Sequence, residues 1–220
     1  MSAEKATSPD VNDTWNHKAA RVLVRPLIGT GVRPNHITTL RVFTGAAACL
    51  LLVELSPANV LWSGVLWIVS GFLDRMDGEL ARIGDMKSRG GHLYDYYSDI
   101  LLNSAFFVAA GIGLRHGMLG GWAPILGAVA GATMLLCCWL SEVYEDLKGR
   151  EVRIWGDDFW GFQPDDGLYL LAPLTWLGWL APVVVATAVC TSAITVVIVV
   201  RLVGLRRRLA RESAVVSGAG

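Results

Sequence analysis

Two apolar stretches of the chain are joined by the segment DRMDGELARIGDMKSRGGHLYDYYSD, residues 74–99. The segment carries two pairs of aspartates: Asp74 and Asp77 are three residues apart, and Asp95 and Asp99 are four apart. Each separation places both carboxylates on one face of a helix, about one turn from each other. Because the loop between the pairs is short, we expect two antiparallel helices whose acidic faces meet.

The composition points to a membrane rather than to a soluble domain. The chain has 220 residues, of which 53% are hydrophobic and 17% charged, and its mean hydropathy is +0.46. These values are too apolar for an ordinary soluble protein and predict an integral membrane protein. Lys and Arg number 19, as do Asp and Glu, so the net charge indicates no nucleic-acid partner.

A membrane-spanning helix needs ~20 mostly apolar residues. By that measure the chain offers six spans, of which the fifth is short: 37–54, 58–76, 93–114, 121–143, 166–179 and 181–203. Before them, the segment WNHKAARVLVRPL (residues 15–27) alternates apolar and basic residues as an amphipathic interfacial helix does. The predicted fold class is therefore an all-α integral membrane protein, a six-helix bundle preceded by an N-terminal amphipathic helix.

The positions of the basic residues predict which side of the membrane each loop occupies. With the spans drawn as above, Lys and Arg gather in alternate loops, and of the 19 only Arg115 falls in the opposite set. Both termini and the aspartate segment are thus expected on the cytoplasmic side. We expect three parts: a cytoplasmic N-terminus with the amphipathic helix (1–30), a six-helix transmembrane domain (31–205), and a basic, then disordered, tail (206–220).

Four carboxylates brought together at low dielectric would repel one another strongly. One or two bound divalent cations would remove this conflict. Because all the ligands are hard oxygen donors, the pattern favours Mg²⁺ or Mn²⁺, with water or substrate phosphates as further ligands. The sequence therefore predicts a metal centre at the cytoplasmic ends of two spans.

The residues between the acids point to a nucleotide or diphosphate ligand. Gly78 and Ala81 follow Asp77 on the same helix, and Gly91 precedes Asp95 by one turn, so a ligand could approach the backbone there. Taken singly, such glycines more often serve close helix packing. Two further residues can contact phosphate oxygens, Arg82 through its planar guanidinium and Ser88 through its hydroxyl.

In order and spacing, these residues resemble the signature of the CDP-alcohol phosphotransferase (CDP-alcohol phosphatidyltransferase) family, at every fixed position: Asp74, Asp77, Gly78, Ala81, Arg82, Gly91, Asp95 and Asp99. The segment PNHIT, residues 34–38, is also similar to that family. The resemblance implies a six-helix membrane enzyme, usually a homodimer, in phospholipid biosynthesis. Such an enzyme transfers a substituted phosphoryl group, often phosphatidyl, from a CDP-linked donor such as CDP-diacylglycerol to a hydroxyl acceptor and releases CMP.

The resemblance also implies a role for each site residue. Asp74, Asp77, Asp95 and Asp99 would be the metal ligands, with the first three holding a two-metal centre, and Asp99 would also be the general base for the acceptor hydroxyl. The CDP donor would contact residues of both helices and of the first span: Gly78, Ala81, Arg82, Ser88, Gly91, Asn35 and Thr38. His92 is an alternative base, although its position favours an interfacial or capping residue.

The acceptor is not fixed by these residues. Ile100 follows the last aspartate where many family members have a basic residue, and the fourth span carries no cation. That span ends in three acids, Glu142, Glu145 and Asp146, so we expect an acceptor without its own phosphate. Whether the donor carries a lipid or a soluble alcohol stays open. A bacterial-type cell membrane is the expected location.

Two other functions also fit an intramembrane acid cluster. A membrane prenyltransferase holds a diphosphate with aspartates and Mg²⁺, but it is expected to have more spans and differently spaced acidic motifs. A cation transporter would use the carboxylates as an ion path. Because all four acids fall at one membrane face, beside Gly78 and Arg82, the sequence favours the phosphotransferase.

Overall fold

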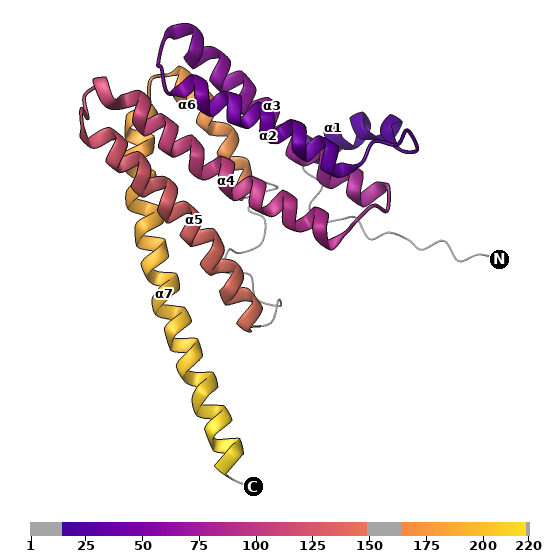
Figure 1. Cartoon of the computed structure of the whole chain (residues 1–220), viewed down its shortest axis with the longest axis vertical. Coiled ribbons are helices and arrows are strands. Elements are labelled where there is room, and N and C mark those ends of the chain that lie inside the picture. The colour runs from indigo at the N-terminus through magenta and orange to yellow at the C-terminus, as the bar shows by residue number, and fades with distance from the viewer. Residues whose placement is uncertain (1–14, 149–163, 219–220) are drawn as a thin grey trace, which may run out of the picture.

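The computed structural model describes residues 15–148 and 164–218, and in this part of the chain the regular structure is entirely helical (Figure 1). The longer helices are α1 (Trp15–Val24), α2 (Pro34–Leu52), α3 (Pro57–Ile83), α4 (Arg89–Gly113), α5 (Trp122–Lys148) and α7 (Leu180–Gly218). Shorter elements connect them: η1 (Arg25–Leu27), η2 (Leu114–His116), η3 (Pro164–Leu170) and α6 (Leu171–Trp176).

Helices α2, α3 and α4 form the part of the bundle that positions the aspartates. The helix α2 packs on both α3 and α4, while α1 and α6 pack on α3. On the other side, α4 packs on α5 and α5 on α7, so the long α7 lies farthest from α1 (Figure 1). The aspartate helices α3 and α4 therefore meet through α2, which lies against both of them.

Serine caps begin both aspartate helices, and a short turn joins them. The helix α3 is capped by Ser56, whose side chain accepts a hydrogen bond from the Asn59 amide, and Ser88 caps α4 in the same way. In the short connection, Asp85 has a φ of 52°, a left-handed conformation that Asp and Asn adopt more readily than most residues. This tight turn reverses the chain between the two helices.

The core combines aromatic, aliphatic and small side chains. Trp67 of α3 packs against Phe106 of α4 with ring centroids 4.4 Å apart. Between α4 and α5 the backbones approach so closely that a Cβ on Gly111 would lie 2.7 Å from the Cα of Gly127. Glycines at both positions therefore permit the close helix contact.

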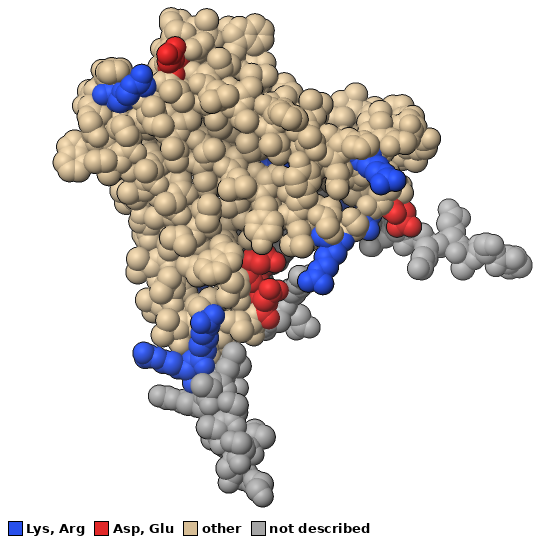
Figure 2. Space-filling model, viewed as in Figure 1, with Lys and Arg blue, Asp and Glu red and all other residues tan. Residues whose placement is uncertain are grey.

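Three helical segments are long and apolar enough to cross a membrane: Arg89–His116, Trp122–Leu147 and Leu180–Arg207. A shorter apolar segment, Gly167–Trp176, accompanies them. Figure 2 shows a broad uncharged face over the bundle, with charged side chains gathered toward its edges. The protein is thus an integral membrane protein. The six-span count stays a prediction, because polar site residues lower the hydropathy of α2 and α3.

The structure differs from the sequence-based expectation at several helix ends. The helix α3 continues to Ile83, past the predicted span 58–76, and so carries Asp77 through Arg82 in helical form. The fifth predicted span, 166–179, is divided between η3 and α6. The tail predicted to be basic and then disordered, 206–220, is helical to Gly218, since Arg, Leu, Ala and Glu are good helix formers. The first 14 residues lie outside the described part, and both the interfacial position of α1 and the three-part division stay predictions.

Candidate active site

An arginine that the sequence analysis did not select lies at the centre of the aspartates. The side chain of Arg41, in α2, is 4% exposed. Its Nη1 lies 2.5 Å from Asp74 Oδ1 and 3.0 Å from Asp95 Oδ1, and its Nη2 lies 2.5 Å from Asp99 Oδ1. One guanidinium therefore connects carboxylates of α3 and α4, which confirms that the two acidic faces meet.

Three of the four aspartates can serve a metal ion. Asp74, Asp77 and Asp95 each offer one carboxylate oxygen, and these oxygens lie within 4.8 Å of one another. An all-oxygen set of this kind fits Mg²⁺ or Mn²⁺. The carboxylate of Asp77 also accepts a 2.6 Å hydrogen bond from Thr38 Oγ1, which holds it in place from α2. Asp99 is not in this group, although the sequence analysis included it among the metal ligands.

Beside Asp77 and Asp95 lies a pocket of about 270 Å³, here called the Gly78 pocket. It is lined by Pro34, Asn35, Thr38, Asp77, Gly78, Ala81, Met86, Lys87, Ser88, Gly91, His92 and Asp95. A Cβ added to Gly78 would meet no atom within 4 Å, so this glycine faces open space. A Cβ at Gly91 would lie 2.9 Å from Ser88 Oγ and 3.1 Å from Asn35 Oδ1, so a side chain there would crowd the pocket wall.

Six of the seven predicted donor-binding residues line this pocket, and Arg82 does not. Arg82 forms a short ion pair with Glu79, a residue that the sequence analysis did not select. Ser88 is in the pocket wall, but its hydroxyl accepts from the Gly91 amide at 3.0 Å as the cap of α4. Ser88, not His92, thus provides the cap, and His92 lies on the pocket lining.

Glu79 connects α3 to the N-terminal helix. It is buried near the C-terminal end of α3, past the predicted span, and its carboxylate is 2.9 Å from His17 Nδ1 and 3.1 Å from Arg21 Nε. Burial by itself would raise the pKa of Glu79, but the hydrogen bonds from Arg82, Arg21 and His17 bring the pKa below its usual value. Glu79 therefore stays ionised and holds both α1 and the Arg82 side chain.

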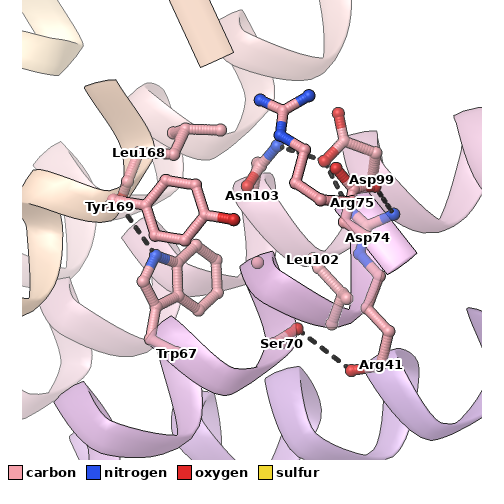
Figure 3. Close-up of a pocket in the computed structure, with 11 residues that line it drawn as sticks. Arg41, Trp67, Ser70, Asp74, Arg75, Asp99, Leu102, Asn103, Leu168 and Tyr169 are labelled. Atoms are coloured by element: carbon pink, nitrogen blue, oxygen red, sulfur yellow. Dashed lines mark hydrogen bonds and ion pairs between the residues drawn. The ribbon is translucent and has the colours of Figure 1, made fainter. Parts of the chain in front are cut away.

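A second, smaller pocket is lined by Arg41 itself, and it is here called the Tyr169 pocket (Figure 3). It has a volume of about 50 Å³ and is lined by Arg41, Trp67, Ser70, Gly71, Asp74, Arg75, Asp99, Leu102, Asn103, Leu168 and Tyr169. Trp67 Nε1 donates to the Leu168 carbonyl at 3.0 Å, so η3 is fastened to α3 at the pocket wall. Arg41, Asp99 and Asp74 lie in the wall of this pocket, and Asp74 also belongs to the group that can hold a metal ion.

One oxygen of Asp99 is held and the other is not. Its Oδ1 accepts from Arg41 Nη2 at 2.5 Å and from Asn103 Nδ2, one helical turn further along, at 2.9 Å. Among the described residues Oδ2 has no hydrogen-bond partner. The carboxylate is therefore fixed through one atom, while its second oxygen stays available at the edge of the Tyr169 pocket.

The family comparison agrees with this arrangement. Residues 32–156, more than half of the chain, match the family model of the CDP-alcohol phosphatidyltransferases, and this stretch contains all four aspartates, Arg41 and the Gly78 pocket. The chain belongs to the CDP-alcohol phosphatidyltransferase family. It is therefore a phosphotransferase enzyme of the membrane, and the family match favours this activity over the prenyltransferase and transporter alternatives.

A solved structure supports the fold. The crystal structure of Mycobacterium tuberculosis phosphatidylinositol phosphate synthase (PgsA1) with CDP-DAG bound superimposes with a TM-score of 0.62 at 17% sequence identity. The match covers 83% of this chain and 90% of that one. At this identity the likeness concerns the fold, an arrangement of helices that the two proteins share. No curated protein sequence matches the chain.

The sequence analysis missed four residues at the site: Arg75 and Asn103 lie on the aspartate helices themselves, and Arg41 and Tyr169 come from α2 and η3. Arg41, Arg75, Asn103 and Tyr169 line the Tyr169 pocket, and none of them belongs to the family signature. Two signals in the sequence could have found them. A buried charge such as Arg41 inside an apolar span is a functional candidate by itself, and Asn103 lies four residues after Asp99, on the same helix face.

Proposed function

We propose that this enzyme transfers a phosphatidyl group from CDP-diacylglycerol to a hydroxyl acceptor and releases CMP. The observation that carries the proposal is the placement of the aspartates between two pockets. The larger Gly78 pocket has space beside Gly78 and Ala81 for a nucleotide, and the smaller Tyr169 pocket has a free carboxylate oxygen. A lipid donor is favoured because the structural neighbour was solved with CDP-DAG bound.

On the donor side, Gly78 and Ala81 leave room for the cytidine and the diphosphate, and Asn35 and Ser88 offer polar groups at the pocket wall. We assign Asp74, Asp77 and Asp95 as the residues that hold Mg²⁺ or Mn²⁺, and we keep two ions as the proposed number. Bound there, the metal would neutralise the diphosphate and stabilise negative charge on the CMP leaving group. The predicted contact of Arg82 with the donor would require Arg82 to leave Glu79.

On the acceptor side, Asp99 acts as the general base. Arg41 and Asn103 fix its Oδ1, so Oδ2 can take the proton of the acceptor hydroxyl. The acceptor oxygen then forms a bond to the phosphorus that carries diacylglycerol. The bond between that phosphorus and the bridging oxygen breaks, and CMP leaves with both electrons of the broken bond.

For the acceptor, we propose a hydroxyl compound without its own phosphate, such as a polyol or an amino alcohol. Among the described residues that line the Tyr169 pocket, Arg41 and Arg75 are balanced by Asp74 and Asp99. The guanidinium of Arg41 already binds three carboxylates, so it has little remaining capacity for a phosphate. Charge balance of this kind favours a neutral polar group over a dianion.

The function is tested with purified protein, CDP-diacylglycerol, Mg²⁺ or Mn²⁺, and a panel of acceptors, with CMP followed by mass spectrometry. We expect CMP release that depends on the acceptor, with glycerol, inositol, serine or ethanolamine. Turnover with glycerol 3-phosphate or inositol phosphate alone would refute the acceptor assignment and leave the transfer reaction intact. Absence of CMP release with every acceptor would refute the reaction.

A substitution at Gly78 tests the donor pocket. Gly78→Ala places a methyl group in the Gly78 pocket without touching protein atoms, and alanine stabilises a helix by ~1 kcal/mol relative to glycine. We expect unchanged or higher thermal stability and a KM for CDP-diacylglycerol that rises roughly tenfold or more, the usual effect of a misfitted methyl group.

Gly204→Ala is the matched control for this change. Gly204 lies in α7, away from both pockets, and its added Cβ would also meet no atom within 4 Å. Its KM for the donor should equal that of the wild-type protein. An unchanged donor KM in Gly78→Ala would show that the donor does not occupy this pocket.

We also propose that the enzyme is a homodimer in a bacterial-type cell membrane, with the aspartates at the cytoplasmic face. The basic loops support that orientation, since Arg82, Lys87 and Arg89 lie beside the site. An active site on this face can receive a nucleotide-linked donor made in the cytoplasm.

A further inference from the structure

Arg41 differs from an arginine that forms a single structural ion pair, because it contacts three carboxylates. Its guanidinium reaches carboxylates of two helices, through Nη1 to Asp74 and Asp95 and through Nη2 to Asp99. Its position is fixed from the backbone side as well, because its carbonyl accepts hydrogen bonds from Ser70 Oγ at 3.1 Å and from Thr44 Oγ1 at 2.9 Å. The charge is therefore held in one place between the two pockets.

The acids around Arg41 outnumber the cations. Asp74 and Asp77 face it from α3, and Asp95 and Asp99 face it from α4. The basic side chain beside Arg41 in the Tyr169 pocket is Arg75, while Lys87 and His92 line the Gly78 pocket. Like charges this close repel one another strongly where the effective dielectric constant is well below that of water. Bringing the acidic faces of α3 and α4 together thus requires a positive charge at this point when no metal is bound.

We propose that Arg41 is a built-in counter-ion, which assembles the aspartates before the metal binds and holds the base Asp99 in position. Two of its partners, Asp74 and Asp95, belong to the group that can hold the metal, so Arg41 and the metal compete for the same two carboxyl groups. The third partner, Asp99, is outside that group and stays with Arg41. The metal part of this inference rests on the proposed function, whereas the assembly of the carboxylates does not.

The test measures thermal stability and Mn²⁺ binding, both without substrate. In metal-free buffer, Arg41→Gln should lower the Tm by at least ~6 °C, because removing one partner of a buried ion pair leaves uncompensated charge. Mn²⁺ should restore most of this loss, since it supplies the missing positive charge. Mn²⁺ should also bind Arg41→Gln at least about tenfold more tightly than wild type, because a competing cation has been removed.

Arg115→Gln is the matched control. Arg115 is a partly buried arginine at the opposite end of the bundle, and its Nη1 donates to the backbone carbonyls of Val53 and Ile112. Any loss of Tm in this variant should be the same with and without Mn²⁺, and its Mn²⁺ affinity should be that of the wild-type protein.

A double variant keeps the test decisive if Arg41→Gln does not fold without metal. Arg41→Gln combined with Asp95→Asn removes one acid together with the arginine, so its metal-free Tm should exceed that of Arg41→Gln, or folding should be recovered. An unfolded double variant, an unchanged Tm in Arg41→Gln, or Mn²⁺ affinity that falls in Arg41→Gln would each overturn the proposal. If wild type binds no Mn²⁺, the proposed metal site fails, and the metal-free Tm values still decide the role of Arg41.

Discussion

Asp99→Asn is expected to lower the rate of CMP release by roughly two to four orders of magnitude, while donor binding largely survives. This range is the usual contribution of a positioned general base. The structure explains why asparagine isolates that contribution. Its amide oxygen can keep the contacts of Oδ1 with Arg41 and Asn103, both of which donate. The atom that changes is Oδ2, which becomes an NH₂ group and can no longer accept a proton.

Asp85→Asn is the matched control for this variant. Asp85 is an exposed carboxylate in the turn between α3 and α4, and asparagine tolerates its φ of 52° at least as well. Calorimetric titration of CDP-diacylglycerol measures donor binding, and CMP release at saturating Mg²⁺ or Mn²⁺ measures turnover. The control should show wild-type values for both. Near-native turnover in Asp99→Asn would rule out Asp99 as the base.

Asp77→Asn should abolish both the divalent-metal dependence of turnover and tight donor binding. Asp77 is a member of the proposed metal group, and losing the metal's stabilisation of transition-state charge, worth several kcal/mol, corresponds to a thousandfold or more in rate. The fold should be little affected, because the asparagine side-chain oxygen can still accept the hydrogen bond from Thr38. The phenotype thus differs from that of Asp99→Asn in the binding step.

Titrating Mn²⁺ and CDP-diacylglycerol into the same protein separates these effects. In Asp77→Asn neither ligand should bind as it does to wild type, and residual CMP release should not respond to added metal. Asp95→Asn should behave in the same way, with the additional loss of one charged contact to Arg41. A variant at Asp77 that keeps the full metal response would exclude this group of carboxylates as the metal site.

Much of the site follows from spacing along the chain. The separations between Asp74 and Asp77 and between Asp95 and Asp99 depend only on helix geometry, and the short loop between the helices makes them antiparallel neighbours. Gly78 and Ala81 share a helix with Asp77, so their place beside it is also a local property. For these residues, sequence reasoning and the structure agree on position, while their roles stay predictions.

Residues joined by long-range contacts could not be placed in this way. Glu79 follows Gly78 directly and looks like an ordinary surface acid, yet it is buried against His17 and Arg21 of α1. Glu79 also forms an ion pair with Arg82, whereas the position of Arg82 after Asp77 predicts a contact with the donor. Tyr169 reaches the site from η3, 86 residues after the end of α3 at Ile83, and no periodicity in the sequence connects the two.

The sequence by itself determined the membrane class, the family and the two acidic helix faces, because composition and helical spacing are properties of neighbouring residues. Only the tertiary structure decided what lies between those faces. Arg41 is 54 residues from Asp95 and 58 from Asp99, and its contact with them exists because α2 packs against both α3 and α4. The same packing divides the site into two pockets. Because α2 brings Arg41 to Oδ1 of Asp99, that oxygen is held and Oδ2 stays available.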